Sequence, residues 1–146
     1  MKRLFIQFIF IIGLLFSPMA SASDFPTKKP VGGEPFGYST TNLGDGLYVF
    51  RWWVYRNIFI VTDEGVIVTD PMNPKVANKL LSEIRKITDK PVKYVIYSHN
   101  HHDHISGGKV FKDQGATFIA HKNVLKELGD HPSPATPLPE IGRAHV

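Results

Sequence analysis

Apolar and polar positions along the middle of the chain fall into blocks that predict strands and helices. Aromatic and β-branched residues are dense from Gly46 to Arg56 and again from Asn57 to Thr62, and this composition is typical of strands. The residues Asp63-Glu64-Gly65 separate the second block from the apolar run between Val66 and Asp70. We therefore expect an antiparallel hairpin here, in which Gly65 accepts a positive φ.

A helical pattern follows Asp70. Between Val76 and Ile87, apolar residues recur at steps of three and four, which predicts an amphipathic helix. Pro91 disfavours helical geometry at the residue before it, so the helix should end near Thr88. Beyond it we expect a strand at Val92–Tyr97, a brief helix from about Gly108 to Asp113, a strand at Thr117–Ala120 and a weak helix at Asn123–Leu128.

The N-terminus has the layout of a secretory signal peptide. A basic start, Lys2-Arg3, precedes a non-ionic stretch from Leu4 to Phe16, and the small residues Ala20-Ser21-Ala22 follow. The apolar stretch is shorter than the roughly 20 residues that a membrane-spanning helix needs. We therefore expect a signal peptide over residues 1–22, a periplasmic or secreted protein, and no stable membrane association after cleavage.

Composition narrows the class of protein. The chain has 146 residues and no Cys, so one domain is the default, and the chain can fold in an oxidising compartment without pairing errors. The chain has 17 Lys and Arg and 13 Asp and Glu, and without Lys2 and Arg3 the numbers are 15 and 13. This excess gives no argument for nucleic-acid binding, so we expect a small-molecule substrate and no nucleic-acid partner.

The segments on either side of the domain have their own signatures. Residues 23–42 are rich in Pro, Gly, Ser and Thr without a sustained period, which predicts an extended arm. The last residues, Ile141 to Val146, are also the translation of ATC GGA AGA GCA CAC GTC, a widely used short-read sequencing adapter. We therefore expect residues 140–146 to be adapter read-through.

The segment SHNHHDHISGG carries the clearest chemical signal. His99, His101, Asp103 and His104 stand at i, i+2, i+4 and i+5, the pattern HxHxDH. Residues two apart in an extended stretch point to the same side, so His99 and His101 can bind one ion. If the chain then curls toward the next helix, Asp103 and His104 are turned toward a neighbouring position that suits a second zinc or similar ion.

The alternative is an exposed His-rich loop that binds no ion or scavenges metal without specificity. Such a tract has no need to follow a hydrophobic strand or to contain an Asp. Ligands of catalytic sites, by contrast, commonly lie on loops at strand ends, where a rigid scaffold holds them. Placement and spacing therefore favour a specific site, with His102 at a free position as a non-ligand.

Three further features have two interpretations each. Asp70 could orient a ligand His from outside the metal shell, because metal-bound imidazoles usually donate their other N–H to an acceptor, or it could cap the turn before Pro71. Trp52, Trp53 and Tyr55 could form a wall beside the site, but packing in the core or at an edge is favoured. For His121, a surface or capping role is favoured over a place in the cleft.

With these motifs in place, the stretch from Gly46 to about Leu128 resembles the first half of the metallo-β-lactamase superfamily. The hydrophobic strand ending in Asp70 and the HxHxDH signature occur in the expected order. The resemblance implies an α+β fold, an αββα four-layer sandwich with a dinuclear zinc site, of which residues 43–139 would supply only the first αβ half. In that family the remaining metal ligands come from later in the chain.

The resemblance and the motif together predict a zinc-dependent hydrolase. Zinc lowers the pKa of bound water, and the resulting hydroxide would attack an ester, a thioester or a β-lactam. His99 and His101 would hold the first ion, Asp103 and His104 the second, and Asp103 would also act catalytically by helping to hold the nucleophile. The alternatives are a periplasmic metal-binding or accessory protein without turnover, and an inactive fragment of the hydrolase.

Overall fold

The structure, a computed structural model, describes residues 37–129 and 135–139 of the chain. The predicted signal peptide at 1–22, most of the predicted arm and the predicted read-through at 140–146 lie outside these residues. Among the helices that the structure describes, none is long and apolar enough to cross a membrane.

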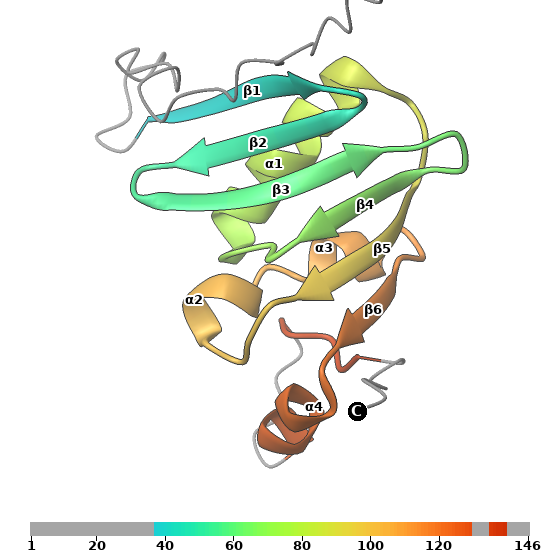
Figure 1. Cartoon of the computed structure of the whole chain (residues 1–146). Coiled ribbons are helices and arrows are strands. Elements are labelled where there is room, and N and C mark those ends of the chain that lie inside the picture. The colour runs from blue at the N-terminus through green and yellow to red at the C-terminus, as the bar shows by residue number, and fades with distance from the viewer. Residues whose placement is uncertain (1–36, 130–134, 140–146) are drawn as a thin grey trace, which may run out of the picture.

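The described residues form one mixed sheet whose six strands lie in the order of the sequence (Figure 1). The first four strands pair antiparallel, whereas β4, β5 and β6 pair parallel. The parallel strands need crossover connections, and helices supply them. The elements are β1 (Tyr38–Gly44), β2 (Leu47–Trp52), β3 (Tyr55–Val61), β4 (Val66–Thr69), α1 (Pro74–Ile87), β5 (Val92–Tyr97), α2 (His102–Ile105), α3 (Lys109–Lys112), β6 (Thr117–Ala120) and α4 (Lys122–Gly129).

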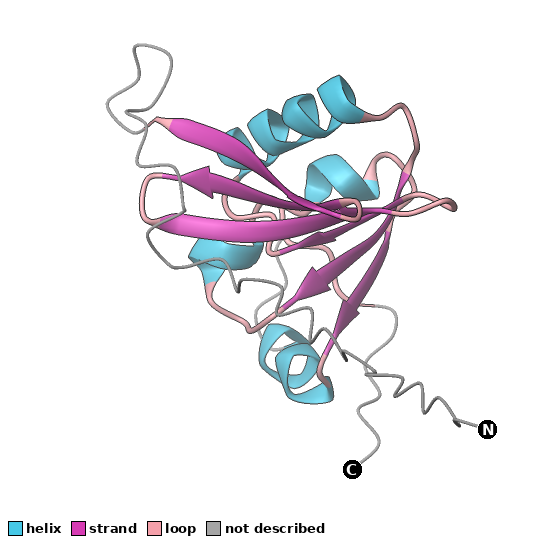
Figure 2. Ribbon diagram, turned by 45° about the horizontal axis from the view of Figure 1, so that its top comes forward, coloured by secondary structure: helices cyan, strands magenta, loops and turns pink. Residues whose placement is uncertain are grey.

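Helices α1 and α3 lie on the same face of the sheet (Figure 2). Asn73 caps α1 by accepting a hydrogen bond from the Val76 N–H at 3.1 Å, and Pro74 stands in its first turn, where a missing N–H costs nothing. The apolar stripe of α1 is buried against alternate residues of the strands. The fully buried side chains of this core include Phe50, Phe59, Val68, Leu80, Ile84, Val95 and Phe111.

The opposite face of the sheet, toward the viewer in Figure 1, carries no described helix over β2 to β5. The strand register places Leu47, Ile60, Ile67 and Tyr94 side by side across this face. Two of its apolar residues, Ile58 and Tyr94, are 42% and 38% exposed. The described residues thus make one sheet with α1 and α3 on one face, which is a partial α+β fold.

The fold confirms most of the predicted elements. The hairpin around Gly65, with φ of +149°, the helix α1, the strands β5 and β6 and the helix α4 lie where the pattern placed them. These elements bury apolar residues at regular intervals, so the apolar periodicity of the sequence was sufficient to locate them.

Two boundaries were wrong, and one helix was not predicted. Strand β1 begins at Tyr38, inside the stretch 23–42 that was expected to be an arm, because this polar edge strand is held by backbone pairing with β2. The predicted strand from Gly46 to Arg56 is divided by a two-residue turn at Trp53-Val54, where Trp53 has a φ of +53° without being Gly or Asn. The short helix α2 begins within the predicted His-rich loop.

The segment between α2 and α3 is fastened to the loop that precedes α1. The Met72 N–H donates to the His104 carbonyl at 2.7 Å, and the Gly107 N–H donates to the Met72 carbonyl at 2.6 Å. A Cβ on Gly107 would lie 2.7 Å from both the Ala77 Cβ and the Pro71 carbonyl oxygen. Gly107 is therefore required for close approach rather than for an unusual φ.

Replacing Gly107 by Ala should destabilise the protein by about 1–3 kcal/mol, because the methyl group has no space between α1 and the loop before it. The measurement is urea denaturation of the full-length protein. Gly129→Ala is the matched control, since a Cβ there meets nothing within 4 Å, and it should change the free energy of unfolding by less than about 0.5 kcal/mol. Equal effects of the two substitutions would contradict this packing account.

Candidate metal centre

Asp70 lies at the carboxyl end of β4 and is 7% exposed. Its backbone N–H donates to the Ile96 carbonyl at 2.9 Å, and its own carbonyl accepts from the Asn57 amide at 3.3 Å. Its φ of +36° lies in a region that L-residues rarely adopt. Strained backbone of this kind persists only when the surroundings fix it, as these two bonds do here.

The carboxylate of Asp70 is satisfied mainly by the first residue after β5. The Ser98 N–H donates to Oδ1 at 2.8 Å, and the Ser98 hydroxyl donates to Oδ2 at 2.6 Å. A buried carboxylate without such donors would be costly. The pair therefore joins the ends of two neighbouring parallel strands, β4 and β5.

The same hydroxyl determines which nitrogen of His99 carries the proton. The Ser98 Oγ lies 2.8 Å from His99 Nδ1, and its single proton is already directed to Asp70. The remaining arrangement is that His99 donates its Nδ1–H to Ser98. This assignment leaves the Nε2 lone pair of His99 available to a metal ion.

Helix α2 brings Asp103 and His104 to the same place. His104 Nδ1 lies 3.3 Å from Asp70 Oδ2, an orientation in which Nδ1–H donates to the carboxylate. The other nitrogen, His104 Nε2, lies 3.8 Å from Asp103 Oδ2. His104 therefore places one nitrogen on a hydrogen-bond acceptor and the other beside a second potential metal ligand.

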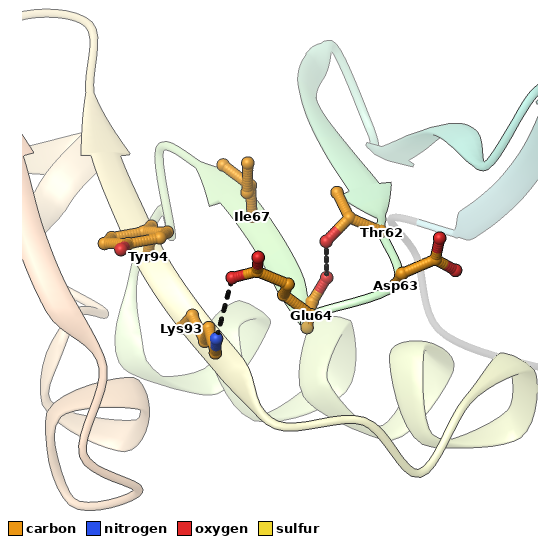
Figure 3. A pocket seen from close by; sticks show the side chains of 7 residues that line it. Thr62, Asp63, Glu64, Ile67, Lys93 and Tyr94 are labelled. Carbon is orange, nitrogen blue, oxygen red and sulfur yellow. Dashed lines mark hydrogen bonds and ion pairs between the residues drawn. The ribbon is translucent and has the colours of Figure 1, made fainter.

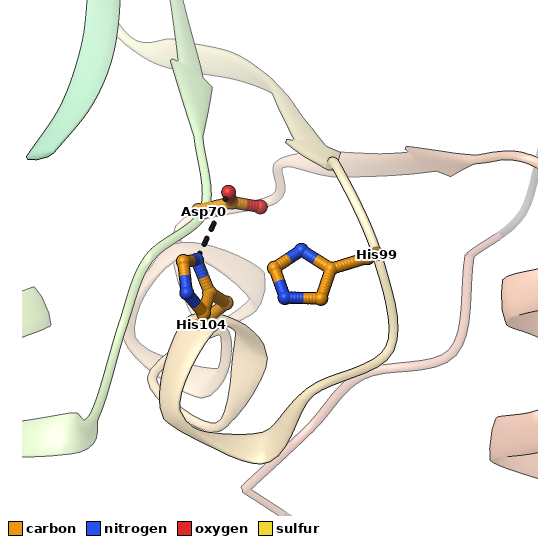
Figure 4. A group of neighbouring side chains, drawn as sticks. All are labelled: Asp70, His99 and His104. Carbon is orange, nitrogen blue, oxygen red and sulfur yellow. Dashed lines mark hydrogen bonds and ion pairs between the residues drawn. The ribbon is translucent and has the colours of Figure 1, made fainter. Parts of the chain in front are cut away.

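The imidazole rings gather at this end of the sheet. The His99 ring centroid lies 4.2 Å from that of His104 and 4.6 Å from that of His101. One donor atom from each of Asp70, His99 and His104 lies within 4.8 Å of the others, so these three side chains could hold a metal ion. Figure 4 shows them pointing toward one another from the end of β4, the loop after β5 and α2.

The structure brings the residues of the HxHxDH pattern together in neighbouring pairs at this end of the sheet, and His99 and His104 form the compact group with Asp70. His101 lies beside His99, and Asp103 lies beside His104. The compact group of three includes Asp70, which the sequence analysis placed outside the metal shell. Because Ser98 and His104 already occupy the Asp70 oxygens, we continue to interpret Asp70 as a support for the histidines.

Two residues have a larger part in the site than the sequence analysis gave them. Ser98 was not singled out, although its position directly after a strand that pairs with the strand ending in Asp70 was a usable signal. Tyr55 was expected to pack in the core or at an edge, but its ring lies 5.7 Å from that of His104 in an edge-to-face contact. The other two His residues considered, His102 and His121, are exposed, and His121 accepts from the Asn123 N–H at 3.3 Å as a cap of α4.

The charges of the site are coupled through Tyr55 and Asp103. The hydrogen bond to Asp103, its negative charge and burial all raise the pKa of the Tyr55 hydroxyl. Burial raises the pKa of the Asp103 carboxyl, but the hydrogen bond from Tyr55, a backbone hydrogen bond, His104 and His101 together hold it below its usual value. Asp103 is therefore a carboxylate and Tyr55 a neutral donor at neutral pH.

A pocket of about 380 Å³ lies at the other end of β4 (Figure 3). Its wall includes Lys93 and Glu64, which form an ion pair at 3.1 Å, and Thr62, whose hydroxyl donates to the Gly65 carbonyl. Lys93 and Glu64 are thus already paired with each other, and Asp63, also in the wall, lies 3.7 Å from the Lys90 ammonium. The chemistry of the described residues is concentrated at the Asp70 end of the sheet.

Two curated proteins are similar to this chain. The linear primary-alkylsulfatase of a Pseudomonas species is 45% identical over 53 residues, which are 36% of this chain and 10% of that protein. Metallo-beta-lactamase IND-1 of Chryseobacterium indologenes is 28% identical over 109 residues, covering 73% of this chain and 44% of that protein. The chain therefore spans less than half the length of either relative.

Solved structures share the fold at low sequence identity. A metallo-beta-lactamase from Pontibacter korlensis matches with a TM-score of 0.64 and 17% identity, covering 74% of this chain and 53% of that chain. The FIM-1 enzyme of Pseudomonas aeruginosa, solved in a mono-zinc form, matches with a TM-score of 0.63 and 13% identity over 83% of this chain and 54% of its own. The single sheet and its helices thus correspond to about half of these folds.

A family model agrees with the geometry and with these relatives. The model of the metallo-beta-lactamase superfamily matches residues 51–138, which is more than half of the chain. The match includes both Asp70 and the whole HxHxDH segment. The chain belongs to the metallo-β-lactamase superfamily.

Proposed function

We propose that the protein is a zinc-dependent hydrolase and that His99, His101, Asp103 and His104 are metal ligands. The observation that carries the proposal is that His99 and His104 meet the buried Asp70 where β4 and β5 end, with His101 beside His99 and Asp103 beside His104. Imidazole nitrogen and carboxylate oxygen without thiolate are a donor set that zinc accepts. Family membership supports a hydrolase.

The contact between Asp103 and His104 supports this assignment of ligands. His99 Nε2 and the imidazole of His101 would hold the first ion, and Asp103 and His104 Nε2 would hold the second. Two ligand atoms at about 2 Å from a tetrahedral zinc ion stand about 3.3 Å apart. The 3.8 Å between His104 Nε2 and Asp103 Oδ2 is close to this value, so a small adjustment would bring both atoms onto one ion.

The residues around the metal positions then have defined roles. Ser98 and Asp70 hold the tautomers and orientations of His99 and His104, as acceptors around metal-bound imidazoles generally do. Asp103 would accept a hydrogen bond from the attacking water and so help to orient it. Zinc, when bound, would lower the pKa of that water toward 7 and stabilise negative charge on the substrate.

The substrate class follows from the reaction and not from a described pocket. A hydroxide nucleophile suits an ester, a thioester or a β-lactam, and the name of the alkylsulfatase relative adds sulfate esters as a class to test. We propose a small-molecule substrate of one of these kinds and a periplasmic or secreted location. Since the chain spans about half of the solved relatives, the activity is proposed for the whole protein.

His101→Ala should lower the zinc-dependent kcat/KM of the full-length protein by more than about 100-fold, because losing a ligand should exceed the 10- to 100-fold effect of losing an outer-shell partner. The assay is hydrolysis of nitrocefin, a thioester, a carboxylic ester and an alkyl sulfate with added zinc. His102→Ala is the matched control at the next residue, the first of α2, and it should retain activity.

The outcomes of this assay separate the candidate functions. Zinc binding with no turnover on the whole panel would favour a metal-binding or accessory protein. Equal activity of the two variants would contradict the assignment of His101 as a ligand.

Ser98→Ala should weaken binding of the first ion by roughly 10- to 100-fold, because His99 loses the acceptor that fixes its tautomer. Isothermal titration of the metal-free full-length protein with zinc measures this change. Ser82→Ala removes an exposed hydroxyl that bonds only to the Lys79 carbonyl in its own helix, and it should bind zinc as the wild type does. Unchanged affinity in the Ser98 variant would show that the hydroxyl does not orient His99.

A further inference from the structure

A row of polar residues crosses three strands of the sheet. The register pairs Ser39 of β1 with Arg51 of β2, and Arg51 in turn with Arg56 of β3. Phe50 and Asn57, their neighbours in β2 and β3, are buried. Because successive residues of a strand point to opposite faces, the two arginines lie together on the face opposite α1 and α3.

The two arginines lie at the same edge of the sheet as the candidate metal centre. Strands β2, β4 and β5 end at this edge, and β3 begins there (Figure 1). Arg56 is next to Asn57, whose amide donates to the Asp70 carbonyl at 3.3 Å. Strand β3 is two strands away from β5, which is followed directly by Ser98 and His99. Two strand spacings are about 10 Å, so one small molecule can reach both places.

The positive charges of the pair are not balanced within residues 37–129 and 135–139. Neither arginine forms an ion pair with a carboxylate of these residues. Like charges directly opposite each other destabilise a sheet. In addition, the Nε of the half-buried Arg51 is a buried donor without a hydrogen-bond partner, and leaving such a donor unpaired costs stability. An anion between the guanidinium groups would remove both costs.

The donors of the pair suit an oxyanion. A guanidinium group presents five N–H donors in a planar fork, and this fork matches the two oxygens of a carboxylate. Arg56 uses one of its donors on the Val54 carbonyl, at 3.0 Å, and the others stay available on an exposed side chain. The hydroxyl of Ser39, next to Arg51 in the register, can add a further donor.

We propose that Arg51 and Arg56 bind an anionic group of the substrate, remote from the bond that is hydrolysed. The proposal rests on the proposed function, in which that bond is broken at the metal centre. It narrows the substrate class to esters, thioesters or lactams that carry a carboxylate or a similar oxyanion on the order of 10 Å from the reacting carbonyl. Binding of a remote group that does not change during the reaction lowers KM and leaves kcat largely as it is.

The test compares two substrates that differ only in the remote group. The para-nitrophenyl ester of octanoic acid is neutral, whereas the mono-para-nitrophenyl ester of suberic acid has the same chain length and ends in a carboxylate. The zinc-loaded full-length protein should have the lower KM for the suberate ester. Arg56→Gln should raise that KM roughly 10- to 100-fold with little change in kcat, because a charge-assisted hydrogen bond is lost. Its effect on the KM of the octanoate ester should be less than about threefold.

Two further variants sharpen the comparison. Arg51→Lys keeps the positive charge but not the planar fork, so it should raise the KM of the suberate ester less than Arg51→Gln does. Lys93→Gln is the matched control, since Lys93 also lies in the sheet but at the opposite edge, where it is paired with Glu64 at 3.1 Å. This variant should keep the wild-type preference for the suberate ester.

The outcomes separate this inference from the proposed function. If the wild type hydrolyses neither these esters nor the earlier panel, the proposed function itself fails. If the wild type does not prefer the suberate ester, or Arg56→Gln changes both KM values equally, the metal site stands and the anion site is overturned. If only another substrate of the panel is hydrolysed, octanoate and suberate are compared as its inhibitors, with the same loss expected for suberate in Arg56→Gln.

A structural role of the pair has its own signature. Should Arg51→Gln fail to fold, Arg56→Gln still decides, because the Arg56 side chain is exposed. A double variant, Arg51→Gln with Arg56→Gln, that unfolds at a lower temperature but keeps the wild-type ratio of the two KM values would contradict the inference. It would show that the arginines bind an acidic group elsewhere in the full-length protein.

Discussion

The buried carboxylate of Asp70 is the group on which the rest of the site depends. It is 7% exposed, so its charge needs hydrogen-bond donors within the protein. Ser98 supplies two of them, and His104 supplies a third at 3.3 Å. These contacts join the end of β4, the end of β5 and helix α2, so satisfying one carboxylate also brings the histidines together.

The arrangement of the sheet explains why the site forms where it does. Strands β4 and β5 are parallel, so the residues that follow them emerge at the same edge. The loop before α1 is tied to α2 by backbone hydrogen bonds between Met72, His104 and Gly107, which keeps α2 against this edge. The turn at Trp53-Val54 brings Tyr55 to the same edge from the antiparallel part of the sheet. Elements from both halves of the sheet thus meet at the candidate metal centre.

Sequence periodicity located the elements that bury an apolar stripe or alternate with the core. It was therefore sufficient for α1, β5, β6 and the hairpin around Gly65. It failed for β1, whose polar residues are held by backbone pairing, and for the turn at Trp53, where a bulky residue adopts a positive φ. Those features depend on tertiary contacts that no local pattern encodes.

The residues of the candidate site likewise fall into those that the sequence pattern identified and those that depend on tertiary contacts. The spacing of His99, His101, Asp103 and His104 was visible in the sequence because one short segment carries all four. The contributions of Ser98 and Tyr55 depend on which strands are neighbours in the sheet. Those neighbours cannot be identified from the sequence until the topology is known. The same holds for Asp70, whose place beside His104 follows from parallel pairing of β4 with β5.

The central claim is that one bend of the chain supplies ligands to a pair of zinc ions while Asp70 remains outside the metal shell. Diffraction from crystals of the zinc-loaded full-length protein at the zinc absorption edge tests it most directly. The account predicts two anomalous peaks, one bonded to His99 and His101 and the other to Asp103 and His104. A single peak bonded to the Asp70 carboxylate, or peaks that leave these four side chains unligated, would contradict it.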